Sequence, residues 1–462
     1  MTQILLLSTY EQGHQPLGLA APAASLRARG HDVQCVDTAV QSLTPETLDG
    51  ADLVGISVPM HTAARLGIAL SKRVRALNPS AKIVFYGLYA SELHDHLVGA
   101  GLADAVVGGE YEIGLANIAE SLEADDSLRG ADGTGSLPLF PRQQYLVPDR
   151  AGLPALDEYA RYDPGDGDLR LAGYVEASRG CAHVCTHCPL TPTYGGRLRL
   201  VQPDVVLADI DALVSLGAEH ITFGDPDFFN AIAHADQITS ELHRRYPTLT
   251  FDATIKVEHL LEHADRIGAF QTRGLSFVTS AFESVDDRLL ALLKKGHTQA
   301  DLEAVLSRAK QIGLTIRPTW LPFTPWTSIQ DFLGILNFVA ERDLVHAVQP
   351  VQYALRLLLP PGSPLVAEAE HDGFLTGFDS DGLSHSWRHP DPLMDTLQAR
   401  FAAYTSEAAA ECDHDDGQRS LGAQFDWIRA ETEVAAGVAL SAGPNAQTSP
   451  PPIPGLTESW FC

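Results

Sequence analysis

Cysteine and positive charge are both scarce in this chain. Six cysteines are spread over 462 residues, too few for the disulfide framework that stabilises small secreted domains. Only 32 lysines and arginines stand against 59 aspartates and glutamates, a net charge of −27, and such a field repels phosphate backbones. A nucleic-acid substrate is therefore disfavoured, and any local concentration of cysteine becomes informative.

Long apolar runs are also missing. No stretch reaches the length of about 18 residues that a membrane span needs, and Met1–Gln3 leads into an apolar run without the basic region of a signal peptide. We expect no membrane partner and a cytoplasmic location, where reducing conditions preserve thiolates and iron-sulfur clusters. With 462 residues, 45% of them hydrophobic, the chain has room for two or three domains.

Three of the six cysteines lie in one short run. Cys181, Cys185 and Cys188 form a CxxxCxxC spacing, which brings three thiolates to one metal centre from a single loop. A four-iron, four-sulfur cluster normally takes four cysteine sulfurs, so three imply one iron with an open coordination position. Structural zinc is the alternative, because His183 and His187 lie inside the loop, although no second CxxC or HxxxH follows at zinc-finger spacing.

The CxxxCxxC spacing resembles the signature of the radical S-adenosylmethionine (radical SAM) superfamily. The resemblance implies that the three cysteines hold a 4Fe-4S cluster whose open iron binds SAM. It further implies reductive cleavage of SAM to a 5'-deoxyadenosyl radical, with electrons from a reducing partner such as flavodoxin or ferredoxin.

The first 122 residues alternate short apolar, β-branched runs with segments of helical length. Strands are predicted at residues 4–8, 32–37, 52–58, 82–86 and 105–107. Strands alternating with helices predict an α/β fold with a doubly wound parallel sheet. Ligands bind such sheets over the carboxyl ends of the strands, although similar glycine- and serine-containing turns also occur in α/β domains that bind nothing.

Residues 1–122 resemble the Rossmann-like cobalamin-binding domains that precede many radical SAM domains. The likeness rests on the Gly-Gly-Glu-Tyr-Glu loop at 108–112 and the Gly-Ile-Ser strand end at 55–57. It implies that cobalamin is a cofactor, bound by residues at several strand ends: Ser57, Gly87, Gly108, Gly109 and Glu110.

One loop departs from the cobalamin-domain pattern. Members that bind cobalt through a histidine carry Asp-x-His-x-x-Gly after the first strand, whereas this chain has Glu11-Gln12-Gly13-His14. Either cobalamin binds without His14 as a lower ligand, or the domain no longer binds it.

The second half also alternates strands and helices. A polar stretch containing glycine and proline, residues 123–165, is predicted to be a linker. Strands are then expected at 174–177, 220–223, 249–255, 275–281, 314–320 and 347–355. These units are too few for an eight-stranded barrel. The radical SAM resemblance implies that residues 166–375 form a (β/α)6 partial TIM barrel with the cysteine loop at its carboxyl-terminal mouth. Residues 376–440 are expected to form a small helical region.

SAM presents an ammonium, a carboxylate, a ribose and an adenine to its site. The Gly-Asp-Pro-Asp-Phe segment at 224–228 resembles an acidic variant of the family's amino-binding loop. Asp225 or Asp227 is therefore assigned to the ammonium, with a simple Asp-Pro turn as the alternative. Residues 280–284 resemble the segment that contacts the ribose and the methionine head, which implies roles for Ser280 and Glu283.

Two further residues are candidates for SAM contacts. Arg317, on the fifth strand, is suited to pair with the SAM carboxylate as a planar fork or with a structural acid. His187 precedes the third cysteine, where relatives carry an aromatic residue near adenine, and its alternative is to face solvent.

The chain reaches Trp460-Phe461-Cys462 through a proline-rich tail, residues 441–462. This ending resembles a short tail of certain radical SAM proteins, Trp-Phe-Cys-(Cys or selenocysteine)-Ala-Glu-Pro. The resemblance implies a catalytic thiol at Cys462 and a chain that continues with selenocysteine, while a frayed terminus is the alternative.

These observations predict a cobalamin-dependent radical SAM enzyme that transfers a methyl or alkyl group to a small or medium-sized organic substrate, such as a natural product. A radical SAM enzyme of metalloid, sulfur or selenium metabolism that uses the tail thiol is a second hypothesis. A non-enzymatic cobalamin or redox sensor is a third, and the SAM-type loops at Asp225 and Glu283 count against it, since a sensor needs no open iron.

Overall fold

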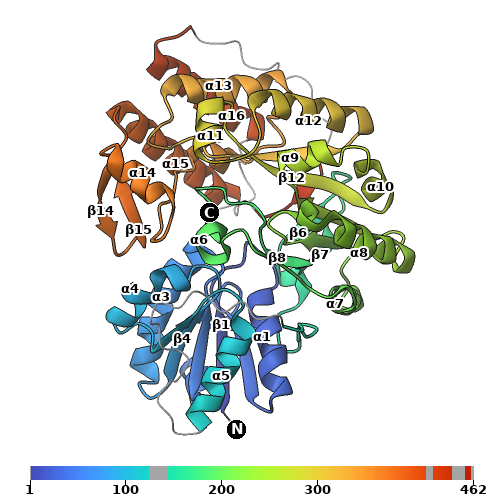
Figure 1. Ribbon diagram of the computed structural model, residues 1–462, viewed down its shortest axis with the longest axis vertical. Coiled ribbons are helices and arrows are strands. Elements are labelled where there is room, and N and C mark those ends of the chain that lie inside the picture. Colours follow the sequence, from blue (N-terminus) through green and yellow to red (C-terminus); the bar gives the residue numbers. More distant parts are fainter. Residues whose placement is uncertain (1, 124–142, 413–419, 440–452, 459–462) are drawn as a thin grey trace.

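The computed structural model describes residues 2–123, 143–412, 420–439 and 453–458. Figure 1 shows an N-terminal α/β region in blue and cyan and a second sheet with its helices drawn from green to orange, with helix α6 (Leu190–Tyr194) between them. Among the described residues, no helix combines the length and apolarity that crossing a membrane requires.

The N-terminal sheet is parallel and doubly wound, as the alternating pattern predicts. Its strand order is β2-β1-β3-β4-β5. The strands are β1 (Gln3–Ser8), β2 (Asp32–Asp37), β3 (Leu53–Ser57), β4 (Lys82–Tyr86) and β5 (Ala105–Val107). One face is covered by α1 (Leu17–Ala28) and α5 (Tyr111–Glu123), the other by α2 (Pro45–Leu48), α3 (His61–Leu77) and α4 (His94–Gly99). The strand order reverses between β1 and β3, where such sheets form a ligand crevice.

The second sheet is a curled half-barrel with the order β13-β12-β11-β10-β7-β6-β16. Its parallel strands are β7 (Arg170–Val175), β10 (His220–Phe223), β11 (Thr250–Thr254), β12 (Leu275–Glu283) and β13 (Thr315–Trp320). The helices are α7 (Pro203–Ser215), α8 (Ile232–Arg245), α9 (Val257–Glu262), α10 (Ile267–Thr272), α11 (Asp287–Leu292), α12 (Gln299–Ile312) and α13 (Ile329–Glu341). Thr298 and Ser328 begin α12 and α13 with capping boxes, which satisfy backbone donors at the helix starts. The partial TIM barrel is confirmed.

The sixth barrel strand, expected at 347–355, differs in the structure. This segment contains the 3-10 helix η4 (Pro350–Ala354), and parallel pairing is limited to an isolated bridge between Phe323 and Arg356. The backbone N–H of Trp320 donates instead to the side-chain oxygen of Gln352, at 3.1 Å. The Gln352 side chain therefore takes the backbone hydrogen bond of β13 that a sixth strand was expected to take. Pro350 itself has no backbone N–H that could form a hydrogen bond between strands.

The C-terminal region combines helices with a small hairpin. Its elements are α14 (Leu365–His371), β14 (Leu375–Asp379), β15 (Ser384–Trp387), α15 (Pro392–Cys412) and α16 (Leu421–Ala436). The two strands pair antiparallel, so the expected helical region begins with a β-hairpin. The hydrophobic pattern of so short a pair did not reveal it.

The expected linker at 123–165 is not a free spacer over its described part. Residues 143–165 include the 3-10 helix η2 (Leu156–Glu158) and β6 (Arg161–Asp163), which pairs antiparallel with β7. Arg150 forms a buried ion pair with Asp209 at 2.7 Å and donates to the side chain of Gln15 at 2.8 Å. This stretch therefore ties the two sheets together.

The tail brings the two ends of the half-barrel together. Strand β16 (Gly455–Leu456) pairs antiparallel with β6 at one end of the sheet, while Arg317 lies on β13 at the other. The Arg317 Nη1 donates to the carbonyl oxygen of Pro454 at 3.1 Å. Leu456 packs against Tyr162, Ala172 and Phe277 inside the barrel. In this structure, Arg317 thus binds the tail, whereas the sequence assigned it to the SAM carboxylate.

The Arg317 contact predicts a measurable effect on the tail. In Arg317→Ala, the backbone N–H of Thr457, which donates to the Arg161 carbonyl at 2.9 Å, should exchange with deuterium about tenfold faster, because a hydrogen bond of about 1.4 kcal/mol is lost. Mass spectrometry of the 453–458 segment measures this rate. Arg342→Ala, which removes an exposed pair with Glu303, is the control. Equal exchange in the parent and both variants would show that Arg317 does not hold the tail.

Candidate functional site

The cysteine loop lies inside a small hairpin above the half-barrel. Strands β8 (Ser178–Gly180) and β9 (Leu198–Leu200) pair antiparallel and frame the loop and α6. Gly180 has φ +72°, and a Cβ at this position would come within 2.4 Å of the Arg197 carbonyl oxygen. Only glycine fits this approach, so the residue before Cys181 sets how the loop leaves β8.

The three thiols of the loop fit an iron-sulfur cluster. Cys181 and Cys185 are buried, Cys188 is half-buried, and all three are free. Burial raises the pKa of the Cys188 thiol to about 12, so the thiol stays protonated at neutral pH without a metal. A bound metal would displace this proton and form the thiolate. The histidines of the loop contact carboxylates: His187 Nε2 lies 3.2 Å from Glu283 Oε1. This donor set favours three-cysteine ligation over a zinc site that combines the cysteines with the loop histidines.

Asp225 supports the cysteine loop from beneath. Its carboxylate accepts the backbone N–H of Ala177 at 2.9 Å and the hydroxyl of Ser178 at 2.5 Å. Burial raises the pKa of this fully enclosed group to about 7. These contacts hold the junction between β7 and β8. Both carboxylate oxygens of Asp225 therefore already accept hydrogen bonds from the protein. Asp227 contacts His183 and His259 instead.

Ser280 and Glu283, both assigned to SAM, differ in their surroundings. Ser280 is fully buried and donates to the carbonyl of Ile255 at 2.7 Å, so its hydroxyl supports the barrel. Glu283 contacts Lys295 Nζ at 3.3 Å and His187. Burial alone would raise the pKa of Glu283, but Lys295 and His187 outweigh it and hold the pKa at about 2. Glu283 also has φ +64°, a strained backbone state for a non-glycine residue that is common at functional sites.

A cavity of about 780 Å³ joins the two sheets. Of the residues assigned to cobalamin, Ser57, Gly87 and Gly109 line it, and His187 lines it from the cysteine loop. Gly108 does not line the cavity. A Cβ at this position would lie 1.4 Å from the Ser91 hydroxyl oxygen, so Gly108 packs against Ser91. The cavity therefore lies at the carboxyl ends of the strands, where the doubly wound sheet predicts a ligand.

Two residues of the β1 loop line the same cavity. Glu11 is half-buried, but its Oε1 is enclosed and unpaired. Desolvation raises the pKa of Glu11 to about 8, so it presents a neutral carboxyl group at neutral pH. His14 stacks on Tyr174 with ring centroids 4.6 Å apart, and burial lowers its pKa to about 4. The unpaired oxygen and the glycine-lined strand ends fit a large polar ligand such as cobalamin, and the imidazole of His14 packs against the half-barrel.

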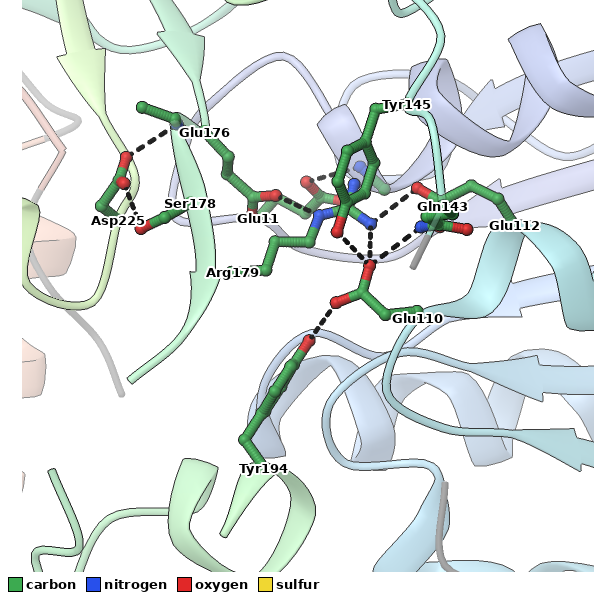
Figure 2. A network of polar contacts seen from close by, with 12 residues as sticks. Glu11, Glu110, Glu112, Gln143, Tyr145, Glu176, Ser178, Arg179, Tyr194 and Asp225 are labelled. Atoms are coloured by element: carbon green, nitrogen blue, oxygen red, sulfur yellow. Dashed lines mark hydrogen bonds and ion pairs between the residues drawn. The ribbon is translucent and has the colours of Figure 1, made fainter. Parts of the chain in front are cut away.

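Glu110, assigned to cobalamin, belongs instead to a buried network around Arg179 (Figure 2). Tyr145 donates to Glu110 Oε2 at 2.7 Å and Tyr194, on α6, to Oε1 at 3.2 Å. Gln143 donates to Oε2 at 3.0 Å. With 3% of its surface exposed, Glu110 has no free carboxylate for a cofactor.

The Arg179 side chain joins three carboxylates from two regions. Its Nη1 lies 2.6 Å from Glu112 and 3.4 Å from Glu110, and its Nε donates to Glu176 at 2.8 Å. Burial opposes the charge of Arg179, but the carboxylates raise its pKa well above the usual range. Burial raises the pKa of Glu176. The network connects the β5–α5 loop to β8, two residues before Cys181.

Sequence reasoning missed Arg179, Glu112 and His259, and it considered His183 only as a possible zinc ligand within the cysteine loop. The signals for the first two were local: Arg179 lies two residues before Cys181, and Glu112 closes the Gly-Gly-Glu-Tyr-Glu segment. His183 and His259 are far apart in the sequence, and nothing in their spacing indicates that they meet.

Comparison with known proteins places both halves in families. Residues 175–336 match the radical SAM superfamily and residues 4–123 match the B12 binding domain. The chain is 25% identical over 324 residues to hopanoid C-3 methylase of Methylococcus capsulatus, a match that covers 68% of this chain and 62% of that protein. The chain spans between 51% and 62% of the length of the first curated relatives.

Two solved structures share the fold over 94% of this chain. One is the cobalamin-dependent SAM radical enzyme OxsB with aqua-cobalamin and S-adenosylmethionine bound, with a TM-score of 0.70, 14% identity and 72% of that chain covered. The other is the radical SAM methyltransferase TsrM from Kitasatospora setae with tryptophan substrate and a SAM analog, with a TM-score of 0.66, 16% identity and 96% covered.

Fold and site together define a protein that joins a B12-type Rossmann domain to a radical SAM half-barrel. The chain belongs to the cobalamin-binding radical SAM enzymes, and its two domains imply a 4Fe-4S cluster, SAM and cobalamin as cofactors.

The cysteine loop predicts the iron content of the protein. Anaerobically reconstituted protein should hold about four irons per chain, and Cys181→Ala, Cys185→Ala and Cys188→Ala should each lose the cluster. Cys35→Ala, which changes a buried thiol of the N-terminal sheet, is the matched control and should retain it. Iron and sulfide analysis tests this. Stoichiometric zinc without iron would contradict the assignment.

The Arg179 network predicts a large loss of stability when the guanidinium is removed. Arg179→Met leaves buried carboxylates without their cation, so unfolding should become easier by about 3–5 kcal/mol. Arg342→Met, which removes an exposed pair with Glu303, should cost about 1 kcal/mol or less. Urea unfolding under anaerobic conditions compares the two. If both variants shift the midpoint equally, the network does not carry the stability inferred from its burial.

Proposed function

We propose that this enzyme transfers a methyl or alkyl group to a small or medium-sized organic substrate by cobalamin-dependent radical SAM chemistry. One observation carries the proposal: a single cavity of about 780 Å³ is lined by strand-end loops of the B12-type sheet and by the cysteine loop. When bound, the cluster and SAM supply a carbon-centred radical, and cobalamin supplies a transferable methyl group. A shared cavity would bring both to one substrate.

The residues around Glu283 are our candidates for holding SAM. Lys295 offers an ammonium for the SAM carboxylate, and Glu283 offers an acceptor for the ribose hydroxyls or the SAM ammonium. His187 lines the cavity and contacts Glu283 at 3.2 Å, so its ring is suited to pack beside the adenine. Each of these groups carries charge or hydrogen-bonding capacity into a buried region, where such contacts are strong.

The cobalamin would bind over the switch point between β1 and β3. Ser57, Gly87 and Gly109 line that part of the cavity, and their small side chains allow close approach of a bulky ring. His14 is stacked on Tyr174, so we expect cobalamin to bind without cobalt ligation by this residue.

The relatives differ in their substrates, and the charge of the chain supports a small one. The curated relatives include a hopanoid methylase and a tRNA-modifying synthase from Leifsonia xyli, which is 25% identical over 286 residues. With a net charge of −27, this chain would repel a phosphate backbone, which favours a small molecule over a nucleic acid. A cytoplasmic location and a flavodoxin- or ferredoxin-like reductant are part of the proposal.

A second candidate function involves the tail thiol. Cys462 lies outside the described residues, but Glu458 accepts a hydrogen bond from Tyr10 at 2.8 Å, next to the loop residues that line the cavity. Cys462 follows Glu458 by four residues, and four residues span at most about 14 Å. Chemistry on a soft electrophile, such as a metalloid or a sulfur or selenium compound, would use such a thiol.

The test uses SAM labelled with a trideuteromethyl group, dithionite and added cobalamin under anaerobic conditions. Mass spectrometry should detect 5'-deoxyadenosine and transfer of the label to cobalamin. Lys295→Met should weaken SAM binding by about 10-fold or more, because a charge-assisted contact is worth about 1.5–3 kcal/mol. Lys294→Met, the exposed neighbour, should bind SAM as the parent does.

Three outcomes discriminate between the hypotheses. Deoxyadenosine without labelled cobalamin would contradict methyl transfer but retain radical chemistry. Labelled cobalamin without deoxyadenosine would contradict radical chemistry. Cys462→Ser should form both products as the parent does if the thiol takes no part in these steps. The second candidate function then predicts that this variant fails to form product only when a soft electrophile is supplied as substrate.

A further inference from the structure

Three side chains with metal-binding atoms converge beside the cysteine loop. His183 lies in the loop, Asp227 follows β10, and His259 lies on α9. One ligand atom from each lies within 4.8 Å of the other two. His259 Nδ1 is 2.7 Å from Asp227 Oδ2, and His183 Nε2 is 3.6 Å from the same oxygen.

The converging atoms lack hydrogen-bond partners. Asp227 is completely buried, yet its Oδ2 has no hydrogen bond of acceptable geometry, and neither do His183 Nε2 and His259 Nδ1. A buried carboxylate oxygen without a partner costs several kcal/mol in apolar surroundings. Neither imidazole has hydrogen-bond geometry toward Asp227 Oδ2, whereas a cation at the centre would accept a lone pair from each of the three atoms.

The surroundings orient the Asp227 carboxylate. The backbone N–H of Lys256 donates to Asp227 Oδ1 at 3.3 Å, which leaves Oδ2 directed at the two histidines. Glu258 Oε2 lies 3.7 Å from the other ring nitrogen of His183. That separation is too long for a hydrogen bond, and Glu258 Oε2 accepts from Lys256 Nζ at 3.2 Å, so Glu258 adds negative charge beside His183 without fixing its ring.

The three groups are distinct from the cluster ligands. Cys181 Sγ receives a hydrogen bond from Asn230 at 3.4 Å, while His183, two residues later, is directed at Asp227. The cysteines supply sulfur, and this group supplies two nitrogens and one oxygen. Such a set suits a divalent ion of intermediate softness, such as Zn²⁺ or Fe²⁺, and leaves a coordination position for water.

We propose that His183, Asp227 and His259 bind one divalent transition-metal ion, separate from the iron-sulfur cluster. The ion joins the cysteine loop to the segments that follow β10 and β11. It would therefore fix the loop at a third point, in addition to the Asp225 contacts and the Arg179 network. This inference does not depend on the proposed methyl transfer, because its residues are defined without cobalamin or substrate.

Zn²⁺ is the probe, added to protein whose 4Fe-4S cluster has been reconstituted so that the cysteines are occupied. After desalting, elemental analysis should find about one zinc per chain. X-ray absorption should show nitrogen and oxygen ligands at about 2.0–2.2 Å and no sulfur at about 2.3 Å. Sulfur ligation would place the ion in the cysteine loop and overturn the proposal.

The variants His259→Ala and Asp227→Asn each remove one ligand. Loss of a residue that only orients a ligand typically weakens metal binding by about 10- to 100-fold, so loss of a ligand should weaken zinc binding by more than that. His263→Ala is the matched control, because this residue stacks beside His259 with ring centroids 5.9 Å apart but contributes no atom to the site. It should bind zinc as the parent does.

Iron content separates this site from the cluster. His259→Ala should keep about four irons per chain while it loses zinc, because all three cysteines are intact. Should His259→Ala fail to fold by circular dichroism, Asp227→Asn and His183→Gln provide the same comparison. The proposal is overturned if the parent binds no zinc above background, or if the folded ligand variants retain zinc as tightly as the parent.

Discussion

The Arg179 guanidinium, buried among carboxylates from two regions, is the contact on which the rest of the site depends. Glu110 lies in the loop after β5, Glu112 lies in the first turn of α5, and Glu176 lies beside β8. Three acidic groups around one cation would repel one another without it. Arg179 therefore holds the two regions together immediately before the cysteine loop begins, and it lines the cavity between them.

Other hydrogen bonds that hold the cysteine loop also join buried polar groups to defined partners. Asp225 holds the start of the loop through Ala177 and Ser178, and Thr186 donates from its backbone to the Leu293 carbonyl at 3.1 Å. A cluster with one open iron requires three thiols at fixed positions. Because buried hydrogen bonds specify geometry more strictly than apolar packing does, these contacts position the thiols.

The half-barrel also needs closure on its open side, and the tail contributes to it. Strand β16 extends the sheet beyond β6, and Arg317 reaches from β13 to Pro454. An open edge of a sheet exposes unpaired backbone groups, which β16 partly covers. The described part of the tail, residues 453–458, is thus part of the barrel structure. Arg317, whose strand position suggested a contact with SAM, contributes to this closure instead.

The sequence by itself determined the features whose signal is local. The CxxxCxxC spacing, the alternating strands and the Gly-Gly-Glu-Tyr-Glu loop are contiguous, so local patterns were enough to predict both α/β folds and the place of the cavity. The three cysteines as cluster ligands stay a prediction from the same kind of local pattern. Only the tertiary structure decided the partners of individual side chains. Glu110 bonds to Tyr145, Arg317 to Pro454, and Asp227 contacts His183 and His259. These pairs join segments far apart in the chain, and no local pattern records which distant residue neutralises a given charge once both are buried.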